Sequence, residues 1–256
     1  MLDRSRDWQN TPPGFSAVTG SAGRRMIVRD ELREFLAAKV FSSPDSAGEP
    51  SPLSGRSQIR SIQLPNGRRA LLRSYRHGGL LRAATGSVFF SRPLRPFREL
   101  ALTEEARRRG VLTIVPCGAG VESLYGVFYR GWFLSEELED ARDLWAVASD
   151  GRGDLGSSEE IWVAAGRSLR RMHRNGVWHN DLNLKNILLR TEDAALTSYI
   201  IDLDQARLFE GAVPNVDAEQ NLARLLRSIR KLDPERRHIS YRDWNTLLES
   251  YHGSVR

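Results

Sequence analysis

The stretch His179-Asn180-Asp181-Leu182-Asn183-Leu184-Lys185-Asn186 is followed by an apolar run and then by Ile200-Ile201-Asp202. In the phosphoryl-transfer pattern of kinases, an Asp two residues after a His accepts a hydroxyl proton. An Asn five residues later binds magnesium, and an Asp after the next strand pair binds the bridging magnesium. The spacing therefore predicts Asp181 as the catalytic base and Asn186 and Asp202 as metal ligands.

Local signals on both sides place this stretch between a helix and a hairpin. Ser157 and Glu160 have the spacing of a capping box at the start of an amphipathic helix, and Asn175-Gly176 is a helix-ending signal. Ile187–Leu189 is typical of a short buried strand, and Tyr199–Ile201 of its hairpin partner. Because helix, loop, hairpin and Asp follow one another in the order of a protein kinase, an ordinary polar surface loop is the weaker interpretation.

Length and composition indicate a globular chain. Its 256 residues, 40% of them hydrophobic, are enough to bury a sizeable core. No run approaches the 18 or more apolar residues of a membrane span, and Met1–Asp7 lacks the apolar core of a secretion signal. The single Cys117 excludes an internal disulfide, suits a reducing compartment and is expected to be a small filler without a chemical role. We therefore expect a cytoplasmic location.

The positive charge is concentrated in the front half of the chain. The formal net charge is +6, but Arg56–Arg109 alone holds thirteen Arg against three Glu, an excess of ten positive charges. Such a field attracts nucleotide phosphates, nucleic acid or an anionic membrane surface. The chain has 35 Arg and only three Lys, so a solvated, Arg-rich surface explains part of this excess. Charge alone does not select a substrate.

The order of the expected elements predicts an α+β fold, the two-lobed protein-kinase-like fold. We expect a weakly ordered leader over residues 1–25, a small antiparallel β-rich N-lobe over 26–135 and a mostly helical C-lobe over 136–256. Asn66-Gly67 is the strongest hairpin signal and would join strands over Ile59–Leu64 and Ala70–Tyr75. Further expected elements are helices over Arg29–Val40, Phe97–Arg109 and Asp217–Lys231, and a strand over Gly126–Leu134.

A kinase also needs a cation on a strand of its first lobe and a helix Glu that orients this cation. Ala70-Leu71-Leu72-Arg73 stands where Val-Ala-Ile-Lys would, so Arg73 is the candidate cation and Glu99 its candidate partner. Arg76 competes with Arg73 for this role. A surface Arg and a Glu near a helix start explain the two residues equally well. If Arg73 does contact phosphate, the planar guanidinium requires a different geometry from a lysine ammonium.

Other nucleotide contacts have weaker signals. A Walker-type phosphate loop is absent from the sequence, and the Gly-rich loop of kinases is reduced to a segment around Gly55. Backbone groups near Glu136 to Leu138 are expected to hold adenine, by position along the chain. Asp202 is not followed by Phe-Gly, and no Ala-Pro-Glu occurs later. The short segment before the next helix favours a small or lipid-borne hydroxyl acceptor over a peptide.

Four stretches resemble the lipopolysaccharide kinase family, and within it the kinases that act on 3-deoxy-D-manno-octulosonic acid (Kdo) of the inner core. The resemblance runs from about Arg56 to Lys231. The stretches that carry it are Leu72–Leu80, with its Arg-Tyr-basic-Gly-Gly pattern, Arg95–Glu99, His179–Leu189 and Asn221–Ser228.

This resemblance implies a protein-kinase-like fold, ATP with Mg²⁺, and an Arg in the cation position. It implies transfer to the 4-hydroxyl of Kdo on a lipid A precursor by a protein peripherally bound to the anionic cytoplasmic face of the inner membrane. The sequence departs from the family at Asn180, at Ser57, and in a long Ser/Pro-rich insert before Gly55. These departures concern the nucleotide loop more than the chemistry.

Alternatives remain open from the sequence. The same motifs permit a kinase for a core heptose, another small molecule or a protein. A basic membrane- or nucleic-acid-binding pseudokinase is the non-enzymatic alternative. The retention of Asp181, Asn186 and Asp202 speaks against it, and we expect no nucleic-acid partner. The number of metal ions and the oligomeric state stay undetermined.

Overall fold

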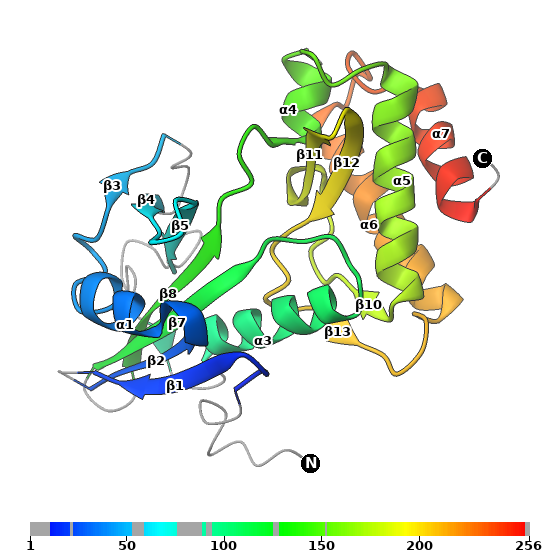
Figure 1. Ribbon diagram of the computed structural model, residues 1–256. Helices are drawn as coiled ribbons and strands as arrows, with labels where there is room; N and C mark the ends of the chain where they lie inside the picture. The colour runs from blue at the N-terminus through cyan, green and yellow to red at the C-terminus, as the bar shows by residue number, and fades with distance from the viewer. Residues whose placement is uncertain are drawn as a thin grey trace. The chain divides into compact units, whose positions relative to one another are not determined.

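The computed structural model describes residues 11–20, 23–52, 59–75, 89–90, 94–124, 128–151 and 153–253. The chain divides into two units. The first comprises Met1–Glu104 and Val115–Glu137, and the second comprises Glu105–Ile114 and Leu138–Arg256. The described part of the first unit is dominated by an antiparallel sheet and that of the second by helices (Figure 1).

An eight-stranded antiparallel sheet organises the first unit. Its order is β1-β2-β7-β8-β5-β4-β3, and β6 pairs with β8. The strands are β1 (Phe15–Thr19), β2 (Arg24–Arg29), β3 (Glu49–Pro50), β4 (Ile59–Gln63), β5 (Arg69–Ser74), β6 (Phe89–Phe90), β7 (Pro116–Leu124) and β8 (Phe128–Glu136).

The predicted hairpin is confirmed and sets the position of Arg73. Strands β4 and β5 pair on either side of Asn66-Gly67, and the Asn66 side chain accepts the Arg68 N–H at 3.1 Å. On its other edge β5 pairs with β8, with Arg73 opposite Phe133. Arg73 therefore lies on a strand that is hydrogen-bonded on both sides.

The chain enters this sheet earlier than expected. Strand β1 lies inside the range predicted as a weakly ordered leader, and all five of its residues pair with β2. The prediction of weak order is wrong for this segment, because sheet pairing and the buried Phe15 ring stabilise it. The helix expected over Arg29–Val40 is present as one continuous helical stretch after β2, in which the turn type changes from η1 (Asp30–Leu32) through α1 (Arg33–Phe35) to η2 (Leu36–Val40).

These helical pieces cover one face of the sheet. Leu36, Val40 and Phe41 are buried in a core cluster with Leu72 and Leu134 of the central strands.

Strand β7 accepts the Phe41 ring at Gly120, where a Cβ would lie 2.8 Å from the ring. The stretch Gly118-Ala119-Gly120, whose glycines are typical of a loop, is therefore part of a strand that packs against an aromatic side chain. Cys117 is buried beside it, and burial raises the pKa of its thiol to about 12, which fits a structural filler.

Helix α3 (Arg95–Arg108) confirms the helix predicted near Phe97–Arg109. Phe97, Leu100 and the carboxylate-bearing Glu99 of this helix are all buried. The helix places Glu99 in the first unit, and its last turn belongs to the second unit.

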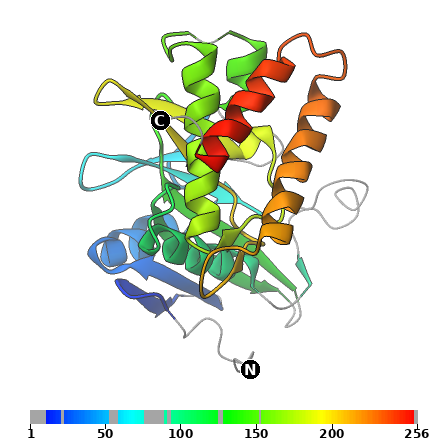
Figure 2. The ribbon, with the colours of Figure 1, turned by 90° about the vertical axis from the view of Figure 1, so that its right-hand side faces the viewer.

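The described residues of the second unit form four helices, a two-stranded antiparallel sheet of β10 and β13, and a three-stranded antiparallel sheet in the order β12-β11-β9. Helix α5 packs along α7, as Figure 2 shows, and also against the hairpin strand β12. The helices are α4 (Leu144–Ser149), α5 (Ser158–Arg174), α6 (Asn215–Leu232) and α7 (Tyr241–His252). The strands and the short 3₁₀ turn are β9 (Arg142–Asp143), β10 (Val177–Trp178), η3 (Leu184–Asn186), β11 (Ile187–Glu192), β12 (Ala195–Ile200) and β13 (Arg207–Leu208).

Candidate active site

The predicted catalytic stretch leaves helix α5 through a tight turn. The expected capping box is present: the Ser157 hydroxyl accepts the Glu160 N–H, and the Glu160 carboxylate accepts the Ser157 N–H at 2.7 Å. Beyond the other end of the helix, Gly176 has φ +72°, and a Cβ there would lie 2.3 Å from the Gly211 carbonyl oxygen. Glycine is thus required where the chain turns from α5 into β10.

His179 joins the loop to the segment that carries Asp202. Its Nδ1 accepts the Asp181 N–H at 3.0 Å, and its Nε2 lies 2.9 Å from the Ile201 carbonyl oxygen, to which it donates. The imidazole is 1% exposed, and burial lowers its pKa, while the charges of Asp202 and Asp181 act in the opposite direction. A neutral ring protonated on Nε2 satisfies both contacts, so His179 shapes the loop.

Asn186 completes a closed set of hydrogen bonds. Its Nδ2 donates to the Asp181 carbonyl oxygen at 2.9 Å, and its own carbonyl oxygen accepts the Ile201 N–H at 3.0 Å. The segments that carry Asp181, Asn186 and Asp202 are therefore joined directly. The structure brings the three predicted residues together within the second unit.

Asp202 itself has an unusual backbone. Its φ is +65°, in the left-handed region that non-glycine residues rarely adopt. Such a conformation costs about 1–3 kcal/mol and persists only where the surroundings impose it. Both backbone polar groups of the preceding Ile201 are held, by Asn186 and His179. The strain is thus located at the residue predicted to bind metal.

The donor set at this place suits magnesium. Among the described residues no group of three or more His, Cys, Asp or Glu side chains could hold a metal ion. Magnesium, however, is commonly held by one or two protein oxygens together with substrate phosphates and water. The Asn186 Nδ2 is engaged with Asp181, which turns Oδ1 the other way. One amide oxygen and the Asp202 carboxylate are hard oxygen ligands of the kind this ion takes.

Asn221 of helix α6 is a residue that sequence reasoning missed as part of the site. Its Nδ2 donates to the His179 carbonyl oxygen at 2.7 Å, and its Oδ1 accepts the His179 N–H at 3.0 Å. The same Oδ1 lies 3.1 Å from Nε2 of the buried His173. Asn221 is fully buried and clamps the loop from outside its sequence neighbourhood. The only sequence signal for Asn221 is its place in the stretch Asn221–Ser228, which resembles the lipopolysaccharide kinase family.

In the first unit, Arg73 and Glu99 form the predicted ion pair. The Arg73 Nη2 lies 2.5 and 2.6 Å from the two Glu99 carboxylate oxygens. Glu99 is 1% exposed while the Arg73 side chain is 30% exposed, so the carboxylate is buried and the cation remains accessible. This arrangement orients a guanidinium group as the pattern requires.

Tyr75 is a second residue whose part in the site the sequence did not reveal. Its hydroxyl donates to the Glu99 carboxylate. The Arg73 guanidinium carbon lies 5.3 Å from the centre of the Tyr75 ring and 5.9 Å from that of Phe133. The aromatic rings and the carboxylate together restrict the position of Arg73.

The residues predicted to bind adenine, Glu136 to Leu138, make hydrogen bonds within the protein. The Glu136 N–H donates to the Val115 carbonyl oxygen at 2.8 Å, and its carboxylate pairs with Arg68. The Glu137 N–H donates to the Arg69 carbonyl oxygen at 2.9 Å. The Leu138 carbonyl oxygen accepts the Ala141 N–H at 3.3 Å. Gly55 and the competing cation Arg76 lie outside the described residues.

Within the described ranges, no helix combines the length and the apolar character needed to cross a membrane.

Comparison with known proteins gives a consistent result. The family model for the lipopolysaccharide kinase (Kdo/WaaP) family matches residues 51–251. The 3-deoxy-D-manno-octulosonic acid kinase of Xylella fastidiosa (strain 9a5c) is 37% identical over 187 residues, covering 71% of this chain and 70% of that protein. The protein of the same name from Vibrio vulnificus (strain YJ016) is 34% identical over 201 residues, covering 77% and 80%.

A solved structure supports the fold. The structure of WaaP in complex with acyl carrier protein matches with a TM-score of 0.56 at 18% identity, covering 93% of this chain and 88% of that chain. This likeness confirms the expected α+β, protein-kinase-like fold class.

Proposed function

The chain belongs to the lipopolysaccharide kinase (Kdo/WaaP) family, and we propose that it transfers the terminal phosphate of ATP to the 4-hydroxyl of Kdo on a lipid A precursor. Family and relatives support a Kdo kinase of lipopolysaccharide biosynthesis. The choice of hydroxyl and the use of ATP with Mg²⁺ are the further parts of the proposal.

The observation that carries the chemistry is the hydrogen-bonded set that joins Asp181, Asn186 and the segment of Asp202. In the proposed reaction the Asp181 carboxylate accepts the proton of the acceptor hydroxyl. The hydroxyl oxygen forms a bond to the terminal phosphorus of ATP, the bond to the bridging oxygen breaks, and ADP leaves. Asn186 and Asp202 would hold Mg²⁺, which would neutralise charge on the phosphates.

In the first unit we assign phosphate binding to Arg73. Glu99 orients its guanidinium group, and Tyr75 holds Glu99 in turn. Guanidinium presents a rigid fork of N–H donors, so this contact fits two phosphate oxygens where a lysine would act as a point charge.

We propose that backbone groups of the segment from Glu136 to Leu138 bind adenine. Because the amides of Glu136 and Glu137 already donate to backbone carbonyl oxygens, the proposal rests on Leu138. Gly55 is proposed for the phosphate-covering loop on sequence grounds.

A lipid-borne acceptor suits the charge of the chain. The excess of ten positive charges over Arg56–Arg109 favours an acceptor that carries a carboxylate and phosphates. It also favours peripheral association with the anionic cytoplasmic face of the inner membrane, an attraction that decays over about 8 Å at physiological salt.

The test is a transfer assay with purified protein, Mg²⁺, ATP and Kdo-lipid A precursor. We expect a product heavier by one phosphate group, with phosphorus coupled to position 4 of Kdo in the NMR spectrum. Absence of transfer, together with a normally folded protein, would count decisively against the proposal.

A core heptose is the second acceptor to compare, because the motifs permit it. Parallel assays with heptose-bearing and heptose-free acceptors separate the two activities. A preference for the heptose-bearing acceptor, with phosphate on heptose, would replace Kdo in the proposal. Salt-sensitive binding of nucleic acid without transfer would favour the pseudokinase alternative.

A further inference from the structure

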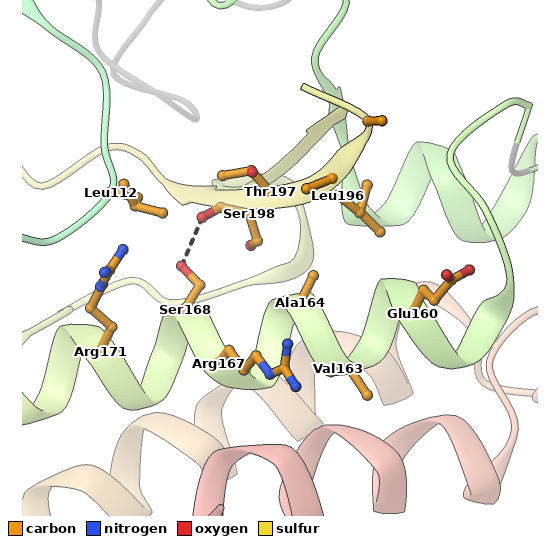
Figure 3. Close-up of a pocket in the computed structure, with 12 residues that line it drawn as sticks. Leu112, Glu160, Val163, Ala164, Arg167, Ser168, Arg171, Leu196, Thr197 and Ser198 are labelled. Carbon is orange, nitrogen blue, oxygen red and sulfur yellow. Dashed lines mark hydrogen bonds between the residues drawn. The ribbon is translucent and has the colours of Figure 1, made fainter. Parts of the chain in front are cut away.

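A groove in the second unit lies between helix α5 and strand β12, with Leu112 at one end (Figure 3). Its volume is about 580 Å³. Apolar side chains from both elements line its middle, among them Val163, Ala164 and Leu196. The groove does not contain the catalytic-loop residues or Asp202, so the reaction proposed above does not explain it.

Two arginines of α5 line the groove. Arg167 and Arg171 are one helical turn apart, and Figure 3 shows them on either side of Ser168, with Arg171 directed toward Leu112. Both are exposed, and neither forms an ion pair with a carboxylate of the described residues. Figure 3 shows Arg167 extending along α5 in the direction away from Arg171. Residues four apart on a helix are neighbours, and because both side chains are exposed, a change of rotamer brings the two guanidinium groups to one anion.

Ser198, a further lining residue of the groove, carries a buried hydroxyl. Ser198 of β12 is 3% exposed, and its Oγ has no hydrogen-bond partner among the described residues. Its carbonyl oxygen accepts the Ser168 hydroxyl at 3.0 Å, which ties β12 to α5. A buried polar atom without a partner is unfavourable in a native structure and requires an explanation. A bound ligand that hydrogen-bonds this hydroxyl would provide one.

We propose that this groove is a second binding site, which takes the phosphate group of a small molecule with an apolar portion. Arg167 and Arg171 bind the phosphate oxygens, and Ser198 donates a further hydrogen bond. The apolar portion lies along Ala164 and Leu196. Guanidinium groups match phosphate by geometry and by charge.

The acidic residue of the groove does not oppose this assignment. Glu160 is seven residues from Arg167, which corresponds to about 10 Å along the helix. Its carboxylate is engaged by the Ser157 N–H and hydroxyl, and these hydrogen bonds lower its pKa. The phosphate therefore belongs at the arginine end of the groove.

The site can be tested by NMR titration of the full chain with hexyl phosphate and, separately, with inorganic phosphate. We expect amide shifts at Ala164 and Leu196 that saturate with one equivalent of hexyl phosphate, with weaker binding of inorganic phosphate. Arg171→Gln should weaken binding about tenfold or more, as expected for a lost charged hydrogen bond. Arg174→Gln removes the same charge from α5 outside the groove and should change affinity less than about twofold.

Ser198→Ala supplies an independent readout. Because the hydroxyl has no partner in the described structure, its removal should leave the unfolding midpoint unchanged or raised, while hexyl phosphate binds more weakly. Three results would overturn the proposal: no saturable shifts at millimolar ligand, equal losses in Arg171→Gln and Arg174→Gln, or shifts confined to the Asp181 loop. None of these results depends on whether the protein phosphorylates Kdo.

Discussion

At the scale of single residues, the backbone of Asp181 and its carboxylate have different roles. Its backbone N–H and carbonyl oxygen hold the loop through His179 and Asn186, whereas its carboxylate belongs to an exposed residue. The side chain can therefore be changed without removing a hydrogen bond that shapes the loop.

Replacement of Asp181 by Asn should accordingly lower kcat by about 10²- to 10⁴-fold, the range for loss of a general base. Nucleotide affinity and the unfolding midpoint should stay near those of the unchanged protein. Steady-state kinetics and calorimetric titration with Mg-ATP measure the two effects. Asp193→Asn, in the exposed turn between β11 and β12, removes the same charge and should leave kcat unchanged. A comparable fall in both variants would exclude Asp181 as the base.

Arg73 can be tested against a second arginine that makes a similar pair. Arg73 contacts both oxygens of the buried Glu99, and Arg68 contacts both oxygens of Glu136 at 3.1 and 2.9 Å, but the Arg68 side chain is 66% exposed. Arg73→Lys should raise the KM for ATP about 10- to 100-fold, because a two-point charged contact is lost. Arg68→Lys should change it less than about threefold. Equal KM values for both variants would show that charge alone suffices at position 73.

At the scale of elements, local signals predicted the parts that carry chemistry. Three predicted features depend only on residues close together in the sequence, and each is present: the capping box of α5, the Asn66-Gly67 turn and the β11–β12 hairpin. Strands β2 and β7 were missed. The glycines of β7 imitate a loop, and their reason, the Phe41 ring, lies far away in the sequence.

Asn221 was missed as a functional residue for the same reason, since its partners in the loop are 42 residues away. Asn221→Ala would leave the His179 N–H and carbonyl group without this partner, at about 1–3 kcal/mol for each buried group. We expect a lower free energy of unfolding and a lower kcat, with the KM for ATP less affected. Gln220→Ala, on the exposed side of the same helix, is the matched control. Denaturant titration measures the stability of both, and an unaltered Asn221→Ala protein would contradict the proposed clamp.

At the scale of the whole molecule, the sequence indicated the fold class through motif order and left the burial of its polar groups undetermined. A buried polar chain illustrates this: Tyr251 of α7 contacts His173 Nδ1 at 2.9 Å, His173 contacts Asn221, and Asn221 holds His179. Its members come from helices α5, α6 and α7 and from the loop, so no local pattern could predict it.

The two histidines of this hydrogen-bonded set make the free energy of unfolding depend on pH. Burial is the largest effect on both His173 and His179 and lowers the pKa of each below the usual 6.5. As pH falls below 6.5, the unfolded chain takes up protons that the folded protein does not. The stabilising contribution is therefore complete above pH 6.5 and is lost as pH falls toward the lowered pKa values. Each histidine contributes a slope of up to about 1.4 kcal/mol per pH unit.

Urea unfolding between about pH 5 and 7.5, above the range in which ordinary carboxylates titrate, should show this loss. His173→Gln removes one of the two groups and should reduce the slope below pH 6.5 by up to about one proton, even though the variant is less stable overall. His252→Gln changes an exposed histidine of α7 and should leave the slope as it was. Because stability and slope are separate observables, an unchanged slope in His173→Gln would contradict the assignment of the pH dependence to this buried chain.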